Sequence, residues 1–517
     1  AAWDIALDKP HDDRWMQWLL SQSRLEVNNM ALRWRDDVLG SEVLVEGIQL
    51  EAVNQLREHR WRIDAKRVGG ALHDASWVAH FHHGLLKNPQ HWRSWHGSLF
   101  FGAQKLDLVE LSHWIDPHWL PSLLPLAGNL QVATWTDFSL AHFRKLQARI
   151  AGQDLALKTP SGTLQLARLQ TAFTAMPRYL PDAQALKAVE LTLAEWSVDD
   201  GLGTQLSGSP ASQRLVIAAD GGLLEGRLAL EPFEVAQALA LVRRLPLPAD
   251  LKKSLESLRA QGQVQRLAVQ FEDSVALGLG AQSSYGASLA VDRLAVDVRS
   301  RESLGSRWPS FEGLSGEVQI DETGGTMKLA GESASLRFPG LFEEPDFAVQ
   351  SARAKVRWRY GERPNDVRID VDELEFANSD GKAFVKGHYQ SGGRGAGLFD
   401  LQGQLSDVRA ERVVRYLPLV VSQELRRWLQ ASVQGGKVSR ANFLLRGDIE
   451  DFPFSKPGTG QFLVEGELAG SRLDYARSWP AIDEVVGRLR FEASTMQIDM
   501  RSGKVMGLAL TDTRATI

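Results

Sequence analysis

Polar and apolar residues alternate at nearly every position between Ala352 and Tyr360. Every second residue of this stretch is cationic, namely Arg353, Lys355, Arg357 and Arg359. The residues between them are apolar, namely Ala354, Val356, Trp358 and Tyr360. Successive side chains of a β-strand point to opposite faces, so the pattern predicts a strand with one cationic face and one apolar face. A helix would mix the two sets, because its period is 3.6 residues.

Weaker forms of this alternation run along most of the chain. Turn residues separate the alternating stretches, as in Glu322–Gly325, Gly361–Asp366 and Asn378–Gly381. The spacing of about 10–15 residues per strand and turn predicts a long antiparallel meander. In the N-terminal part we expect one short helix, Asp12–Ser21, followed by strands over Arg24–Trp34, Glu42–Leu50, His59–Val68, Ala71–Phe81 and Trp95–Phe101.

A longer pattern occurs three times, beginning at Gly97, Gly226 and Gly403. Each copy predicts a strand, a helix that stops before proline, a second helix ended by glycine, and another strand. Leu245 and Leu417 are 172 residues apart, and Trp308 and Trp479 are 171 apart, so two markers give nearly one period. Such self-similarity predicts a repeat architecture. The expected helices are Leu106–Trp119, Val235–Leu245, Asp250–Ala260, Glu411–Leu417 and Ser422–Val433, the last capped by Ser422.

A large antiparallel sheet with one apolar face needs a cover for that face. The expected helices are too few to provide it. Two arrangements satisfy the pattern: the sheet folds on itself as sandwiches, or it curls into an open trough whose apolar face is covered by a ligand.

Composition excludes several classes of protein. The 517 residues carry a net charge of −5 and contain no cysteine, which argues against nucleic acid as the main partner and excludes disulfides and thiolate chemistry. No phosphate-binding loop, Gly-x-Ser-x-Gly elbow or His-Glu-x-x-His motif is present. We therefore expect no enzymatic activity, no cofactor and no metal site. No apolar run is long enough to span a bilayer.

Tryptophan and histidine are concentrated in the N-terminal part. Eleven of the 16 tryptophans lie at or before Trp135. We expect them to form a packing surface. The alternative is a carbohydrate platform, which burial of Trp61, Trp77, Trp92 and Trp95 would exclude. His80 and His82 have the spacing of a metal pair on one strand face, but no third ligand accompanies them, so a solvated face is expected.

The C-terminal third carries the most distinctive motifs. These are Arg415–Pro418, Leu425–Leu429, Gly435-Gly436, Gly447–Phe454, Gly460–Phe462, Leu473–Tyr475 and Trp479-Pro480, with Trp34–Asp36 and Trp95–Leu99 upstream. In these residues the chain resembles the YhdP family of the AsmA-like superfamily of Gram-negative bacteria. The resemblance extends over most of the chain.

The resemblance implies a bridge-like protein that moves phospholipid between the inner and outer membranes. It implies a periplasmic body anchored in the inner membrane by a segment outside this chain. It also implies a mainly β fold: an elongated, curved antiparallel trough of repeated β-groove modules with short helices once per repeat. The expected divisions are 1–105, the end of a preceding module; 106–230 and 231–406, two modules; and 407–517, the start of the next. Both ends alternate like strand interiors, so we expect an interior fragment.

The expected ligand is the acyl part of phospholipids, and the expected oligomeric state is a monomer. The alternative function is an envelope assembly factor that binds unfolded β-segments of outer-membrane proteins. Alternation predicts the residues that line the groove: Val318, Ile320, Leu336, Phe338, Val356, Trp358, Tyr360, Val367, Ile369, Val371, Phe443, Leu445, Phe462, Val464, Leu489, Phe491, Met496 and Ile498.

Overall fold

The computed structural model describes most of the chain, and the structural statements below concern those residues. They are 14–36, 41–84, 94–112, 124–140, 142–159, 162–180, 185–208, 213–219, 223–244, 258–272, 284–298, 310–363, 366–392, 397–419, 421–474 and 479–516. The chain divides into two compact units. Unit 1 comprises Ala1–Phe233, Gln237–Lys253 and Ala268–Ser284, and unit 2 comprises Glu234–Ala236, Ser254–Leu267 and Tyr285–Ile517.

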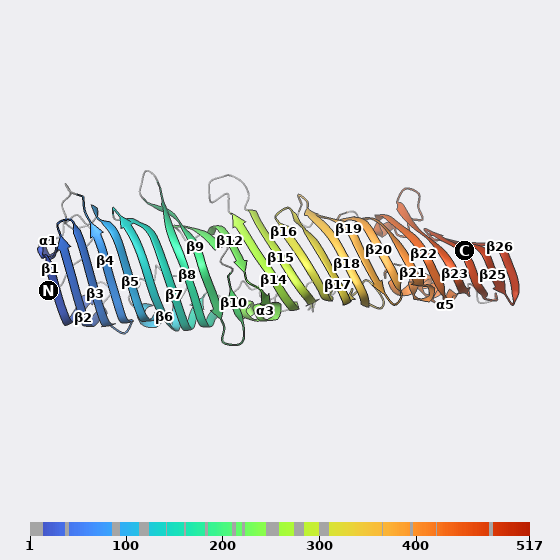
Figure 1. Ribbon diagram of the computed structural model, residues 1–517. Helices are drawn as coiled ribbons and strands as arrows, with labels where there is room; N and C mark the ends of the chain where they lie inside the picture. The colour runs from blue at the N-terminus through green and yellow to red at the C-terminus, as the bar shows by residue number, and fades with distance from the viewer. Residues whose placement is uncertain are drawn as a thin grey trace. The chain divides into compact units, whose positions relative to one another are not determined.

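Unit 1 is a sheet in which strands consecutive in the sequence lie side by side (Figure 1). Each strand from β1 to β9 pairs antiparallel with the next, and β11 then pairs with both β9 and β12. The strands are β1 (Arg24–Asp36), β2 (Ser41–Gln55), β3 (Glu58–Val68), β4 (Leu72–His82), β5 (His96–Asp107), β6 (Leu124–Ser139), β7 (His142–Thr159), β8 (Gly162–Tyr179), β9 (Leu186–Asp199), β10 (Gln205–Ser207), β11 (Gln213–Ala218) and β12 (Leu223–Leu230).

Unit 2 repeats this arrangement. From β15 to β26 each strand pairs antiparallel with the next. The strands are β15 (Ser284–Val298), β16 (Ser310–Asp321), β17 (Gly324–Arg337), β18 (Asp346–Tyr360), β19 (Val367–Asn378), β20 (Gly381–Gln390), β21 (Leu398–Arg409), β22 (Val433–Asp448), β23 (Gly460–Leu473), β24 (Ile482–Glu492), β25 (Thr495–Val505) and β26 (Leu508–Thr516). Where the chain is divided between the units lie β13 (Phe233–Glu234), α3 (Val235–Arg244) and β14 (Leu258–Glu272).

The remaining helices are short. They are α1 (Arg14–Ser21), α2 (Leu108–Ser112), α5 (Gln423–Ser432) and the 3-10 segments η3 (Ala410–Tyr416) and η4 (Ile449–Asp451). The predicted fold class, a mainly β antiparallel sheet with few short helices, is confirmed. The five N-terminal strands lie where alternation predicts them, with ends that differ by up to six residues.

Three predicted helices differ from the structure. Leu106 and Asp107 continue β5, α2 follows at Leu108–Ser112, and the rest of this predicted helix, 113–119, lies outside the described residues. In the predicted helix Asp250–Ala260, the last three residues belong to β14, and 250–257 lie outside the described residues. Residues 410–416 form a 3-10 helix, which suits a segment too short for cooperative α-helix formation.

Asx turns close the hairpins that the sequence predicts. Between β16 and β17, Asp321 Oδ1 accepts hydrogen bonds from the amides of Thr323 (2.8 Å) and Gly324 (3.1 Å). Between β19 and β20, Asn378 Oδ1 accepts from the amides of Asp380 and Gly381. These side chains satisfy amides that the strand ladder leaves unpaired, and so fix the register of the strands they join.

The main buried cluster of unit 2 lies under its helices. Val408, Val438, Leu468, Val485, Met496 and Ile498 are among its buried members, and Val413 of η3 and Trp428 of α5 pack against them. A smaller cluster in unit 1 joins Leu72, Ala75, Ala103 and Leu106 to Leu108 and Leu111 of α2. Each helix thus covers one end of the strands and leaves the rest of the sheet face without a helix over it.

The N-cap of α5 provides a test of how firmly that helix is held. Ser422 Oγ accepts a hydrogen bond from the amide of Leu425 at 3.2 Å. We expect Ser422→Ala to lower the free energy of unfolding by about 1 kcal/mol, measured by urea titration. Ser494→Ala, in the exposed turn between β24 and β25, is the control and should change it by less than about 0.5 kcal/mol. Equal effects of the two substitutions would contradict the capping role.

Candidate functional site

The strand β18 sorts its side chains as the sequence predicts. Its cationic side chains meet acidic side chains of β19: Lys355 pairs with Glu373, Arg357 with Asp372 at 2.6 Å, and Arg359 with Asp370 at 3.3 Å. Hydrogen bonding from Arg357 holds the pKa of the Asp372 carboxyl below its usual range. The apolar side chains of β18 therefore face the other side of the sheet, away from these charges.

One row of apolar residues crosses eight consecutive strands of unit 2. Each member is the direct cross-strand partner of the next, from β16 to β23. We call it the apolar row: Val318, Met327, Val356, Val371, Gly387, Leu401, Leu445 and Phe462. All eight are half-buried, so the row is neither sealed inside a core nor fully exposed.

A second row lies one residue away on each strand and faces the opposite side. We call it the polar row, and its members are also direct partners: Gln319, Thr326, Arg357, Asp370, His388, Asp400, Arg446 and Gln461. Arg446 Nε pairs with Asp400 at 3.1 Å, as Arg357 does with Asp372. Because both rows are uninterrupted across the same eight strands, the two faces of the sheet differ in chemistry along these rows.

Most of the predicted groove residues lie beside the apolar row. Trp358 pairs with Ile369, Tyr360 with Val367, Phe443 with Val464, and Val464 with Phe491. Ile320 lies at the open end of β16, next in alternation to Val318. Tyr360 is 45% exposed, and Phe462 contacts Phe491 with ring centroids 5.7 Å apart.

The other predicted groove residues lie at the end covered by helices. Met496 and Ile498 are 7% and 4% exposed, and Leu489 packs with them close to Trp428. Leu336 packs on buried Ala334 and Val349. Phe338 contacts Phe342 and Phe347, and Tyr416 of η3 lies against Phe347. These five residues form the closed flank of the face rather than its open part.

Sequence inspection did not identify Met327, Gly387 and Leu401 as members of the row. Leu401 does alternate within Phe399–Gly403, which is a signal that could have found it. Gly387 has no side chain, so no hydrophobic pattern could include it. Only the register across strands places the three between the predicted residues.

Two glycines let aromatic rings lie along the sheet. A Cβ at Gly325 would overlap the indole ring of Trp358, and a Cβ at Gly403 would overlap the ring of Phe443. Both glycines are the cross-strand partners of the residues concerned. The rings therefore cover backbone instead of projecting across the apolar face.

Unit 1 has its own apolar hollow. Trp61, Ile63, Trp77, Ala79 and Leu99 line a cavity of about 420 Å³. Trp95 is buried and stacks on Phe81 at 4.3 Å. Trp61 and Trp77 are half-buried on this apolar side, which fits the expected packing surface, and Trp92 lies outside the described residues.

The histidines of this part do not assemble as a metal site. His80 and His82 are exposed, and no group of three or more potential metal ligands occurs among the residues that the structure describes. His59, which sequence inspection did not single out, is instead 2% exposed. Its Nδ1 donates to Asn54 Oδ1 at 2.8 Å, and Trp61 Nε1 donates to the same oxygen at 3.0 Å.

Substituting Gly325 tests whether the fold requires the Trp358 ring to lie flat against the backbone of β17. In Gly325→Ala the new methyl group displaces the Trp358 ring, so we expect the free energy of unfolding to fall by about 1–3 kcal/mol, as in other overpacked sites. Gly435→Ala is the matched control, because a Cβ there meets no atom within 4 Å. Urea titration of both variants measures the difference, and equal stabilities would contradict the ring placement.

The burial of His59 predicts a specific dependence of folding stability on pH. Burial, and then the charge of His83, lowers the pKa of His59 from 6.5 to about 4. The unfolded chain therefore binds this proton at higher pH than the folded chain, so stability is retained above pH 6.5 and falls as the pH drops toward 4. We expect His59→Phe to reduce the slope of the urea midpoint against pH in this window. His80→Gln should leave the slope unchanged, and an unchanged slope in His59→Phe would contradict the assignment.

Among the described residues, no helix has both the length and the apolar character needed to cross a bilayer.

A protein-family model described as YhdP protein matches residues 3–517. No curated protein and no solved structure gives a significant match. The family match spans almost the whole sequence and agrees with the motifs and with the mainly β fold. The chain therefore belongs to the YhdP protein family.

Proposed function

We propose that the chain is part of a conduit that carries phospholipids between the inner and outer membranes of a Gram-negative envelope. In this proposal the acyl chains lie on the apolar face and the headgroups remain in water. The chain would act in the periplasm as a monomer, with an inner-membrane anchor supplied by a segment outside it. YhdP is not a known enzyme family and is linked to envelope lipid transport.

The observation that carries the proposal is the apolar row. It crosses eight strands without a polar interruption, while the polar row occupies the other face. Every member of the apolar row is half-buried, and η3 and α5 cover only one end of the strands. A single-layer sheet leaves such a face to be covered by something other than its own chain.

The free energy gained by burying hydrocarbon makes an acyl chain a suitable cover for the apolar face. Burying each CH₂ group is worth about 0.8 kcal/mol, so a 16-carbon chain that crosses water unprotected costs on the order of 12 kcal/mol. Contact with apolar side chains removes a large part of this cost. Because the attraction is non-directional, no single position along the row holds the chain strongly.

The length of the row suits a ligand that slides. Neighbouring strands lie about 4.8 Å apart, so eight strands extend over roughly 34 Å. One leaflet of a bilayer has a hydrocarbon thickness of about 15 Å, half of the whole core. An acyl chain therefore occupies only part of the row at any time and has equivalent surface ahead of it and behind it.

A charge placed in the row tests the proposal. In Leu401→Asp a carboxylate must lose its water beneath an acyl chain, which is costly. We expect the phospholipid recovered per protein, measured by mass spectrometry of organic extracts of the purified chain, to fall at least fivefold.

Gln402→Asp provides the matched control. It adds the same charge one residue away, on the exposed opposite face, and should leave the lipid content within experimental error. Equal lipid content in the two variants would contradict the conduit. Retention of unfolded outer-membrane protein segments, with no lipid in either variant, would instead favour the assembly-factor alternative.

A further inference from the structure

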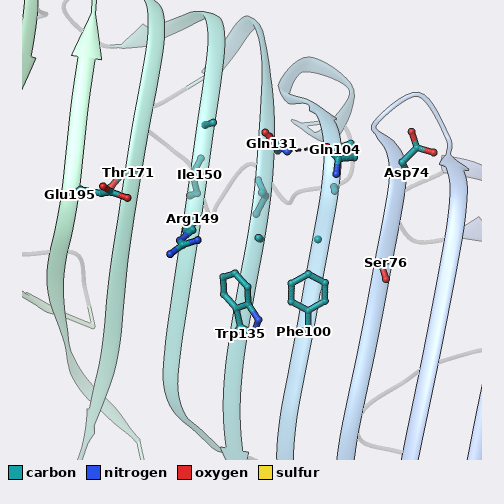
Figure 2. Close-up of a pocket in the computed structure, with 15 residues that line it drawn as sticks. Asp74, Ser76, Phe100, Gln104, Gln131, Trp135, Arg149, Ile150, Thr171 and Glu195 are labelled. Carbon is teal, nitrogen blue, oxygen red and sulfur yellow. Dashed lines mark hydrogen bonds between the residues drawn. The ribbon is translucent and has the colours of Figure 1, made fainter.

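The polar face of unit 1 contains a hollow of about 500 Å³ (Figure 2). Its volume is within the range of small-molecule sites. Gly102 and Ala133 are direct partners on the floor, with Arg149 beside Ala133 and Glu195 two strands further along the same cross-strand row. Small residues at the centre and larger ones around them make this hollow a built depression in the sheet.

Two aromatic rings form one wall of the hollow. Phe100 and Trp135 are direct partners on β5 and β6, with ring centroids 5.4 Å apart. Trp135 is 42% exposed, and its neighbours on this face are mostly polar. Figure 2 shows both rings lying along the sheet, so their faces are available from the solvent side.

Hydrogen-bonding groups form the opposite wall. Gln131 Nε2 donates to Gln104 Oε1 at 2.9 Å, which fixes the two amides and leaves Gln131 Oε1 and Gln104 Nε2 for a ligand. Arg149 and Glu195 line the same hollow, and among the described residues their side chains form no hydrogen bond and no ion pair. Asp74 also lines the hollow, so these groups supply donors and acceptors with one excess negative charge.

This combination defines a class of ligand. Aromatic faces carry a negative quadrupole that attracts the C–H groups of a flat, partly apolar ring. Fixed amides and one excess negative charge suit several neutral hydroxyl groups better than they suit a phosphate or a carboxylate. We propose that the hollow is a binding site for a neutral oligosaccharide, with a sugar ring on Trp135 and Phe100 and its hydroxyl groups toward Gln104, Gln131, Arg149 and Glu195.

The second large hollow of the polar faces offers a contrast. It lies in unit 2, has a volume of about 550 Å³ and includes Phe384 and Gln404. There Arg353 pairs with Glu375 at 3.6 Å, and Phe384 contacts no second ring among the described residues. The hollow of unit 1 is therefore the one of the two that offers a pair of rings to a ligand.

Titration of the chain with cellotetraose, chitotetraose and maltotetraose, followed calorimetrically, tests the proposal. We expect at least one of the three to bind with a submillimolar Kd. Trp135→Ala should weaken that binding at least tenfold, and Trp135→Phe should keep it within about threefold because the ring face is retained.

Leu99→Ala is the matched control, since Leu99 adjoins Phe100 but faces the apolar side. It should bind as the unchanged chain does, and near-UV circular dichroism of each variant verifies the fold. Absence of binding by all three sugars at millimolar concentration, or equal binding by the chain and Trp135→Ala, would overturn the proposal. Both outcomes are independent of the lipid content, because the apolar row lies in unit 2 and shares no residue with the hollow of unit 1.

Discussion

A sheet only one layer thick has two faces in contact with its surroundings, and this constraint governs the molecule. In a two-layer protein the apolar face of each sheet disappears against the other. Here, in unit 2, the apolar row and the polar row are carried by adjacent residues of the same eight strands, and among the described residues η3 and α5 cover only one end of the strands. In the proposed conduit, acyl chains on the uncovered part would therefore add to the stability of the unit.

The polar face contributes in a different way. Ion pairs such as Arg357–Asp372, Arg446–Asp400 and Arg514–Asp499 join neighbouring strands on the solvent side. Exposed pairs of this kind contribute little to stability individually, about 0–1 kcal/mol. Their greater effect is on specificity, because a strand that slipped by one residue would place cationic side chains on the apolar face.

Local alternation made much of unit 2 predictable. Val356, Trp358, Ile369 and Val371 follow from the period of two, and Ser422 follows from its position before an amphipathic stretch. The period determines which face a side chain occupies, but not which residue of the next strand it meets. The closed flank formed by Leu336, Phe338 and Met496 depends on helices that fold back from elsewhere in the sequence.

Other features of the structure could not be predicted from the local pattern of the sequence. Trp135 has the same alternation as the packed tryptophans, and only the register with Phe100 reveals a pair of rings on the polar side. His59 is buried among Phe81, His83 and Asn54. These contacts join three separate parts of the chain, so a local pattern does not predict the burial. Helix propensity also failed at Leu258–Ala260, where the sheet context decides the conformation.

The register shifts in β18 and β19 have a consequence for how such a chain can change in length. The pairing already shifts between Lys355 and Val356, and again between Val371 and Leu374, and the apolar row passes through both without a break. Inserting or deleting a single residue inside one of these strands would invert every side chain beyond that point in the strand. Tolerated insertions and deletions should therefore gather in the connections between strands, or come in compensating pairs.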